Sequence, residues 1–209
     1  MIIIYSKTIT VFSDMKDSSK IKPLLNLFIL FFIYNCAGPA YRKLSADDPG
    51  ALLLMKDSLL QKHGNTEPLL RSLVQAHNSF GISAMEEQNY SAAIDHFNKS
   101  QELIATDTTA KYYVLMAEGH LLYDKGNKNG LWDAIEKFSQ AAQLYGHRGE
   151  PFYYIGLIYR KLGNTDFDLM LESYNKALAL TLPEKTRAEV EAAKENALRR
   201  EKKLKIFWK

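Results

Sequence analysis

Three copies of one spacing pattern constrain this 209-residue chain more than any other feature of its sequence. Each copy places a glycine among apolar residues and, after a polar stretch, a small or apolar residue four positions before an aromatic one. The glycines are Gly81, Gly119 and Gly156, which lie 38 and 37 residues apart. An array with such a period indicates repeated supersecondary units. The later pairs are Ala93 with Phe97, Ala134 with Phe138, and Met170 with Tyr174.

Each copy is expected to fold as a helical hairpin. A glycine lets two helices approach closely, and the large apolar residues around it fill the seam that the helices share. One hairpin cannot bury its own apolar face, so it needs neighbours stacked beside it. No stretch shows the period-two alternation that is typical of a strand. The sequence therefore predicts an all-α protein.

The three copies resemble the tetratricopeptide repeat, a helix–turn–helix unit with the signature W-x2-L-G-x2-Y…A-x3-F…P. The third copy reads Phe-x2-Ile-Gly-x2-Tyr over residues 152–159 and ends at Pro183. The resemblance covers residues 74–184 and implies an α-α superhelix, a solenoid of about three hairpins. The expected repeats are residues 74–107, 112–148 and 149–184.

Helical sequences flank the repeats on both sides. Residues 47–73 open with an acidic pair before Pro49, which is a helix-start signal, and we expect N-terminal capping helices there. Residues 185–209 hold nine Lys or Arg against four Asp or Glu, and we expect a basic C-terminal capping helix. Its cations suit the helix dipole, and contact with anionic lipid headgroups or an acidic partner is the alternative.

Residues 1–35 have the features of a secretory signal peptide. Lys16, Lys20 and Lys22 precede an apolar run over residues 24–34, and small residues follow. This run is shorter than the roughly 20 residues that a membrane-spanning helix needs. Met15 is an alternative start, because residues 15–35 alone have normal signal-peptide proportions.

Cys36 directly follows the apolar run, which resembles a bacterial lipoprotein signal. The resemblance implies that Cys36 is lipidated and becomes the first residue, with residues 36–46 as a tether. The preceding residues 33–35 depart from the usual small residues, so an uncleaved anchor with an incidental Cys36 is the alternative. The expected location is the bacterial cell envelope, with the outer membrane facing the periplasm favoured over the inner membrane.

The sequence lacks the motifs of common catalytic and metal sites. Its five histidines show no His-Glu-x-x-His spacing, and its single cysteine cannot build a Cys/His cluster. It has no Gly-rich phosphate loop and no Gly-x-Ser-x-Gly elbow. A calcium-like spacing over residues 125–136 begins with Lys125, a cation where an anionic ligand is required. We therefore expect a protein that is not an enzyme and that holds no metal or other cofactor.

The first helices of the hairpins carry the candidate binding residues. In the tetratricopeptide repeat family, these helices line a concave groove that usually binds peptides or partner segments. Tyrosine and methionine suit such a surface because they combine large area with a polar handle or with flexibility. The alternative is that Tyr113, Tyr153 and Leu157 pack against adjacent repeats or the end helices. The candidate groove residues are Asn78, Ile82, Met85, Tyr113, Met116, His120, Tyr123, Tyr153, Leu157 and Arg160.

Together these features predict a membrane-anchored lipoprotein that acts as a protein–protein interaction scaffold in the cell envelope. Its partner would be a protein or peptide segment of another envelope protein, and we expect no nucleic-acid partner. Two alternatives remain: an accessory module that regulates a cell-wall synthesis or hydrolysis enzyme, and a cytosolic adaptor with an uncleaved apolar leader. The sequence leaves the oligomeric state unknown.

Overall fold

The computed structural model describes residue 38, residues 40–163 and residues 167–207. These residues form helices joined by short connections, and one isolated bridge pairs Arg148 with Thr181. No strand forms in this part of the chain, so the all-α prediction is confirmed. The chain divides into two compact units, residues 1–72 and residues 73–209, and the division falls within α5 (Glu67–Glu86).

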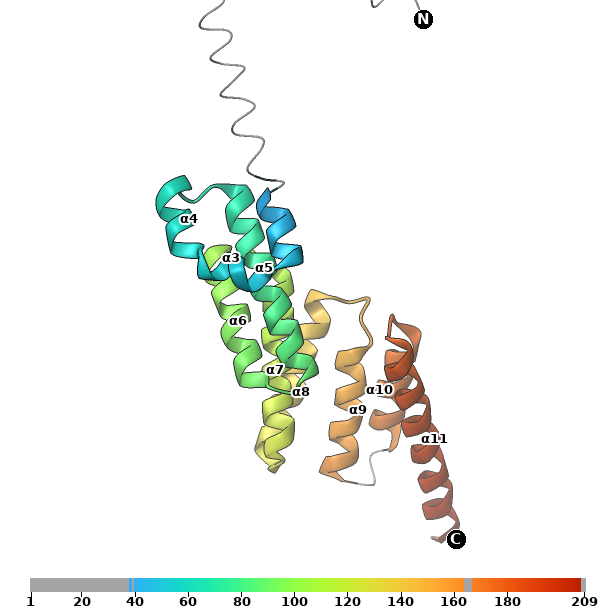
Figure 1. Ribbon diagram of the computed structural model, residues 1–209. Coiled ribbons are helices and arrows are strands. Elements are labelled where there is room, and N and C mark those ends of the chain that lie inside the picture. Colours follow the sequence, from blue (N-terminus) through green and yellow to red (C-terminus); the bar gives the residue numbers. More distant parts are fainter. Residues whose placement is uncertain (1–37, 39, 164–166, 208–209) are drawn as a thin grey trace, which may run out of the picture. The chain divides into compact units, whose positions relative to one another are not determined.

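The first unit contains short helices. Residues 40–47 are helical, where the sequence predicts the end of a tether, and α3 (Pro49–Leu54) and α4 (Lys56–His63) follow (Figure 1). Asp48 caps α3, because its Oδ1 accepts a hydrogen bond from the Ala51 N–H at 2.8 Å. Gly64, with φ of 66°, ends α4 in a left-handed conformation that glycine adopts without strain.

The second unit is a series of antiparallel hairpins (Figure 1). From α6 onward each helix packs against the next one along the chain, and α5 contacts α6 where Gly81 meets the Phe97 ring. The hairpins are α5 with α6, α7 with α8, and α9 with α10, and α11 packs against α10. This arrangement confirms the predicted stack of about three helical hairpins. The helices after α5 are α6 (Tyr90–Leu103), α7 (Thr108–Lys125), α8 (Lys128–Leu144), α9 (Glu150–Leu162), α10 (Phe167–Ala179) and α11 (Glu184–Phe207).

The three glycines lie in the seams of the hairpins, as predicted. A Cβ atom on Gly81 would lie 2.6 Å from the Phe97 ring, and a Cβ on Gly119 would lie 2.8 Å from the Phe138 ring. In the third hairpin the corresponding distance from Gly156 to the Tyr174 ring is 2.4 Å. A side chain at any of these positions would collide with a buried ring, so only glycine lets the paired helices approach this closely.

The last helix seals the third hairpin. Val190 and Ala197 of α11 are buried and belong to the same apolar cluster as Met170 and Tyr174 of α10. Arg187 ties the two helices together by donating hydrogen bonds to the carbonyl oxygens of Leu178 at 3.0 Å and Leu180 at 3.1 Å. These carbonyls close α10, and a cation there also suits the helix dipole.

Candidate partner-binding cavity

The first helices of the hairpins enclose one side of a cavity of about 360 Å³ in the second unit. Its walls come from α5, α7 and α9, from the start of α6 with the turn before it, and from α11. A volume of this size is near the lower end of the range of about 300–1,000 Å³ that ligand pockets occupy. The lining residues are Ile82, Met85, Glu86, Gln88, Tyr90, Tyr112, Tyr113, Met116, His120, Glu150, Tyr154 and Thr186.

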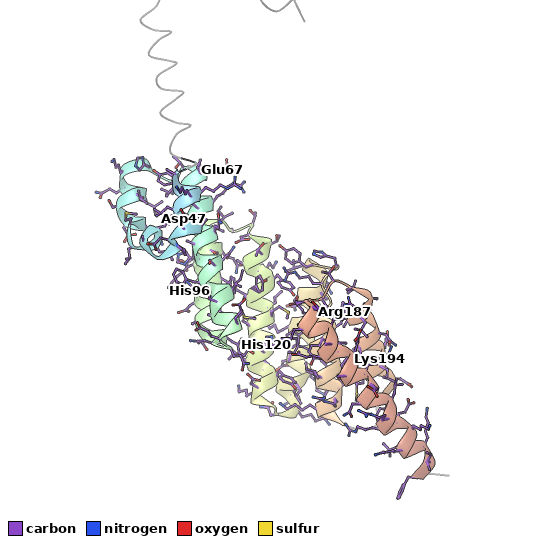
Figure 2. The ribbon with its side chains drawn as sticks, turned by 45° about the vertical axis from the view of Figure 1, so that its right-hand side comes forward. Asp47, Glu67, His96, His120, Arg187 and Lys194 are labelled. Carbon is purple, nitrogen blue, oxygen red and sulfur yellow. The ribbon has the colours of Figure 1, made fainter. Side chains whose placement is uncertain are left out.

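His120 of α7 lines the cavity and contacts rings from three other helices; Figure 2 marks its position on α7. Its ring stacks on Tyr90 of α6 at 4.5 Å between centroids and meets the edge of Tyr154 of α9 at 4.2 Å. The Phe138 ring of α8 lies at 5.5 Å. Burial lowers the pKa of His120 to about 4, because an apolar environment disfavours the charged imidazolium. His120 is therefore neutral at pH 7 and acts as part of an aromatic wall.

Ile82, Met85 and Met116 supply the apolar part of the lining. Met116 is buried and belongs to the central core, whereas Ile82 and Met85 are half-buried. Methionine adapts its shape to different apolar partners because its side chain is unbranched and polarizable. This side of the cavity is therefore suited to an apolar side chain of a bound molecule.

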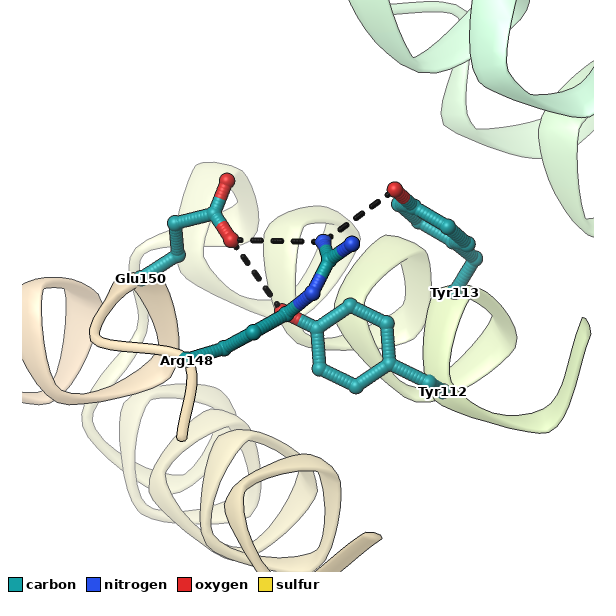
Figure 3. Close-up of polar contacts among 4 residues, drawn as sticks. All are labelled: Tyr112, Tyr113, Arg148 and Glu150. Atoms are coloured by element: carbon teal, nitrogen blue, oxygen red, sulfur yellow. Dashed lines mark hydrogen bonds and ion pairs between the residues drawn. The ribbon is translucent and has the colours of Figure 1, made fainter. Parts of the chain in front are cut away.

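A polar cluster includes three of the lining residues, Tyr112, Tyr113 and Glu150 (Figure 3). Arg148 donates a hydrogen bond to the Tyr113 hydroxyl at 3.2 Å, and its Nη1 lies 3.5 Å from Glu150 Oε2. The Tyr112 hydroxyl donates to the same Glu150 oxygen at 3.4 Å. The guanidinium also lies over the Tyr112 ring, 5.0 Å from its centroid. These contacts hold two tyrosines and one carboxylate in place where α7 meets the start of α9.

Tyr90, Tyr112 and Tyr154 remain protonated at neutral pH. Burial, and then the nearby Glu150 carboxylate, raise the pKa of Tyr112, because both disfavour a phenolate. Burial is likewise the main cause that raises the pKa of Tyr154 and of Tyr90, and Asp124 adds to the effect on Tyr90. The hydroxyls therefore act as neutral hydrogen-bonding groups.

Half of the predicted groove residues lie together in this cavity. They are Ile82, Met85, Tyr113, Met116 and His120. Tyr113 also packs against the preceding hairpin, since its ring stacks on Phe97 at 5.1 Å. Tyr113 therefore lines the cavity and also has the packing contact that the sequence offered as the alternative.

The other predicted groove residues lie elsewhere in the second unit. Asn78 bridges α5, α6 and the start of α7, donating to Asp107 Oδ2 at 2.8 Å and accepting from the Ser100 hydroxyl at 2.7 Å. Leu157 differs most from expectation: it is 8% exposed and packs in the cluster that α9 and α10 form with α11. For Leu157 the packing alternative therefore describes the structure, because α11 covers this face of α9.

Tyr123, Tyr153 and Arg160 form the far part of the predicted groove, away from the cavity. Lys161 lies over the Tyr123 ring at 4.3 Å and donates to the Tyr123 carbonyl oxygen at 2.9 Å. Tyr153 is half-buried, and its ring lies 6.3 Å from that of Tyr174. Arg160 is exposed. These residues do not line the cavity, so the predicted groove is not one continuous site.

Several lining residues escape sequence reasoning. They are Glu86, Gln88, Tyr90, Tyr112, Glu150, Tyr154 and Thr186. Tyr112 lines the cavity together with its selected neighbour Tyr113, whereas Tyr154 lines it in place of the selected Tyr153, because the rotation of α9 turns Tyr154 toward the cavity. Glu150 and Thr186 stand at the starts of α9 and α11, and no sequence signal connects them with α5.

The residues of the calcium-like spacing have a structural role. Asn127 caps α8, because its Oδ1 accepts a hydrogen bond from the Gly130 N–H at 2.6 Å. In the part of the chain that the structure describes, no group of three or more His, Cys, Asp and Glu side chains is arranged to hold a metal ion.

The predicted membrane attachment lies outside the described residues. The signal sequence of residues 1–35 and the lipidation site Cys36 both belong to that part of the chain. Among the described helices, none has the length and apolar character that crossing a bilayer requires.

Comparisons with known proteins give little beyond this geometry. No protein-family model matches the sequence, and no curated protein sequence matches it. Among solved structures, the fragment of MamA from Desulfovibrio magneticus RS-1 that runs from residue 41 to the end is similar, with 14% sequence identity and a TM-score of 0.41. The match covers 75% of this chain and 93% of that one. A similarity this weak gives no information about function.

Proposed function

We propose that this chain is a protein-interaction scaffold whose cavity receives side chains of a partner segment. The observation that carries the proposal is the cavity itself, which is built by the first helices of successive hairpins and lined by aromatic rings, methionine and isoleucine. Burying apolar side chains against such a wall stabilises a complex by about 25 cal/mol per Å² of apolar surface. The cavity has room for one or two side chains, so the partner contributes anchors and the rest of its segment lies outside.

A photo-crosslinking residue placed at Gln88 tests this proposal. Gln88 is exposed at the cavity rim, in the turn between α5 and α6. We expect light-induced capture of a discrete partner protein in cells that express the chain, and loss of this capture in Ile82→Trp, which fills the cavity. The matched control carries the same crosslinker at Glu102, an exposed position of α6 outside the cavity. Equal capture from both positions, or capture that survives Ile82→Trp, would contradict the proposal.

We further propose that the scaffold is attached to a membrane of the bacterial cell envelope through lipid on Cys36. The support for this proposal is the order of basic residues, apolar run and cysteine in residues 16–36. A single acyl chain gives only marginal membrane binding, so stable attachment requires several chains on the cysteine. The envelope partner and the outer-membrane position facing the periplasm are part of the same proposal.

Incorporation of radiolabelled palmitate tests the attachment. The wild-type chain is expected to take up label and to fractionate with membranes, whereas Cys36→Ala is expected to lose both properties. The chain has no other cysteine, so the control is unambiguous for thioester or thioether linkage. Label that persists in Cys36→Ala, or a wild-type chain that stays in the soluble fraction, would favour the cytosolic adaptor instead.

A further inference from the structure

We infer that the segment bound in this cavity carries a lysine or arginine beside its apolar anchor, and that Glu86 and Glu150 recognise the cation. This inference rests on the proposed function, since it names the chemistry of the partner that the cavity accepts. It concerns the cavity lining, in which two carboxylates, Glu86 at the end of α5 and Glu150 at the start of α9, stand among apolar and aromatic side chains.

The charge of the lining is one-sided. Glu86 and Glu150 line the cavity, and no Lys or Arg is present among its described lining residues. Glu86 forms no ion pair among the described residues. Arg148 lies outside the lining and pairs with Glu150 at 3.5 Å, so the two glutamates and this arginine together carry one net negative charge. A cation entering the cavity therefore meets net negative charge.

Further carboxylates surround the same tyrosines. Asp124 lies close enough to Tyr90 to add to the rise in its pKa, and Glu189 of α11 does the same for Tyr154. Both tyrosines line the cavity. The face of an aromatic ring also attracts cations, through its quadrupole. The rings and the carboxylates therefore favour the same kind of side chain.

Glu86 occupies a position that does not suit the stability of its own helix. It is the last residue of α5, where the partial negative charge of the helix dipole disfavours an acid, and Glu87 adds a second negative charge. A lysine or arginine at this end would be favourable for the helix, yet its last turn holds none. A bound cation would supply the missing positive charge, and this gives Glu86 a role in recognition that its structural surroundings do not.

Selection from a random library of short peptides displayed on phage tests the inference. The immobilised bait is the full chain in detergent, and Ile82→Trp serves for counter-selection so that only cavity-dependent binders are kept. We expect the retained peptides to be enriched in Lys or Arg within one helical turn of Leu, Ile, Met or Phe. A retained set that is neutral or acidic would overturn the inference and leave the proposed function intact. Failure to retain any cavity-dependent peptide would overturn both.

The best retained peptide then gives a quantitative test by fluorescence anisotropy. Replacing its basic residue by norleucine keeps the aliphatic stem and removes the charge. This change is expected to weaken binding about tenfold, because the peptide loses its ion pair with a half-buried carboxylate of the cavity. Glu86→Gln and Glu150→Gln should each reduce this preference at least about threefold. Equal affinity of the two peptides for the wild-type chain would overturn the inference.

Two controls separate recognition from folding and from general charge. Glu87→Gln removes an exposed carboxylate next to Glu86 that does not line the cavity, and it should leave the preference for the basic peptide unchanged. Glu86→Gln should not lower the melting temperature, because it removes an acid from a helix C-terminus. An equal loss of preference in Glu87→Gln would show that the general negative charge of this region, and not the lining glutamates, selects the basic peptide. That result would overturn the roles assigned to Glu86 and Glu150.

Discussion

The seam of the third hairpin differs from the seams of the first two by one hydroxyl group. Phe97 and Phe138 cover Gly81 and Gly119, whereas Tyr174 covers Gly156. All three rings are fully buried, but the Tyr174 hydroxyl has no hydrogen-bond partner among the described residues. Burial raises the pKa of this hydroxyl to about 12. A buried hydroxyl without a partner costs about 1–3 kcal/mol.

This difference shows that close approach of two helices and full hydrogen bonding of the buried polar atoms between them are separate properties of a repeat. The third copy matches the tetratricopeptide pattern best in its first helix, and its seam has the shortest approach, at 2.4 Å. The ring that fills this seam is nevertheless the one that carries a buried hydroxyl without a hydrogen-bond partner among the described residues. The motif thus indicates where helices approach and which side chains fill the gap, but not whether every buried polar atom finds a partner.

Substitution of the third seam glycine has the largest expected effect. In Gly156→Leu the new side chain would occupy the volume of the Tyr174 ring, and overpacking should lower the free energy of unfolding by about 3 kcal/mol or more. Urea unfolding followed by circular dichroism at 222 nm measures this change. The matched control is Gly163→Ala, because Gly163 has open space around its Cβ position and an extended φ of 174°. Similar unfolding curves for both variants would contradict the seam assignment.

The residue after each seam glycine gives the next prediction. It is Ile82, His120 and Leu157 in the three hairpins, so only the middle one titrates. The folded-state pKa of His120 is about 4, below the unfolded value of about 6.5, so the unfolded chain binds the proton first as pH falls. The stability that neutral His120 provides is fully present above pH 6.5 and is lost between pH 6.5 and 4, by about 3 kcal/mol.

Comparison with His120→Leu isolates this effect from other titrating groups. The difference in unfolding free energy between wild type and variant, measured at pH 7, 5 and 4, should shift by about 3 kcal/mol in favour of the variant at low pH. A difference that stays constant over this range would show that folding does not lower the pKa of His120.

The smallest effect is expected for the hydroxyl that distinguishes the seams. Tyr174→Phe removes a buried polar group without a partner and should raise the free energy of unfolding by about 1 kcal/mol. Thermal unfolding compares it with the reverse change, Phe138→Tyr, which buries a new hydroxyl in the second seam and should be destabilising by a similar or larger amount. Loss of stability in Tyr174→Phe would mean that the hydroxyl has a favourable interaction, and the contrast between the seams would disappear.

The helices and the seams of the hairpins could be predicted from the sequence, because each depends on residues that lie close together in the chain. Gly119, Ala134 and Phe138 lie within one hairpin, and their spacing alone places a small residue opposite a large ring. The inward positions Val190 and Ala197 of the last helix follow from the same helical periodicity. Such patterns are redundant, since several residues of each helix carry the same information.

The residues that line the cavity could be predicted from the sequence only in part. The first-helix pattern selects Met116 and His120, but it does not distinguish Tyr153 from Tyr154, because neighbouring residues on a helix differ by about 100° in direction. A rotation of the helix by a fraction of a turn exchanges their roles. Leu157 was expected in the groove for the same reason and is instead covered by α11.

By itself the sequence determined an all-α chain, three hairpins with glycine seams, and a sealing helix at the C-terminal end of the repeats. Only the tertiary structure decided that Glu86, Glu150 and Tyr154 share one cavity, that Leu157 belongs to the core, and that the Tyr174 hydroxyl is left without a partner. The physical reason is that helix formation and hairpin pairing depend on residues close in the chain. The relative rotation of successive hairpins depends on the packing of many side chains at once, so no short sequence pattern predicts it.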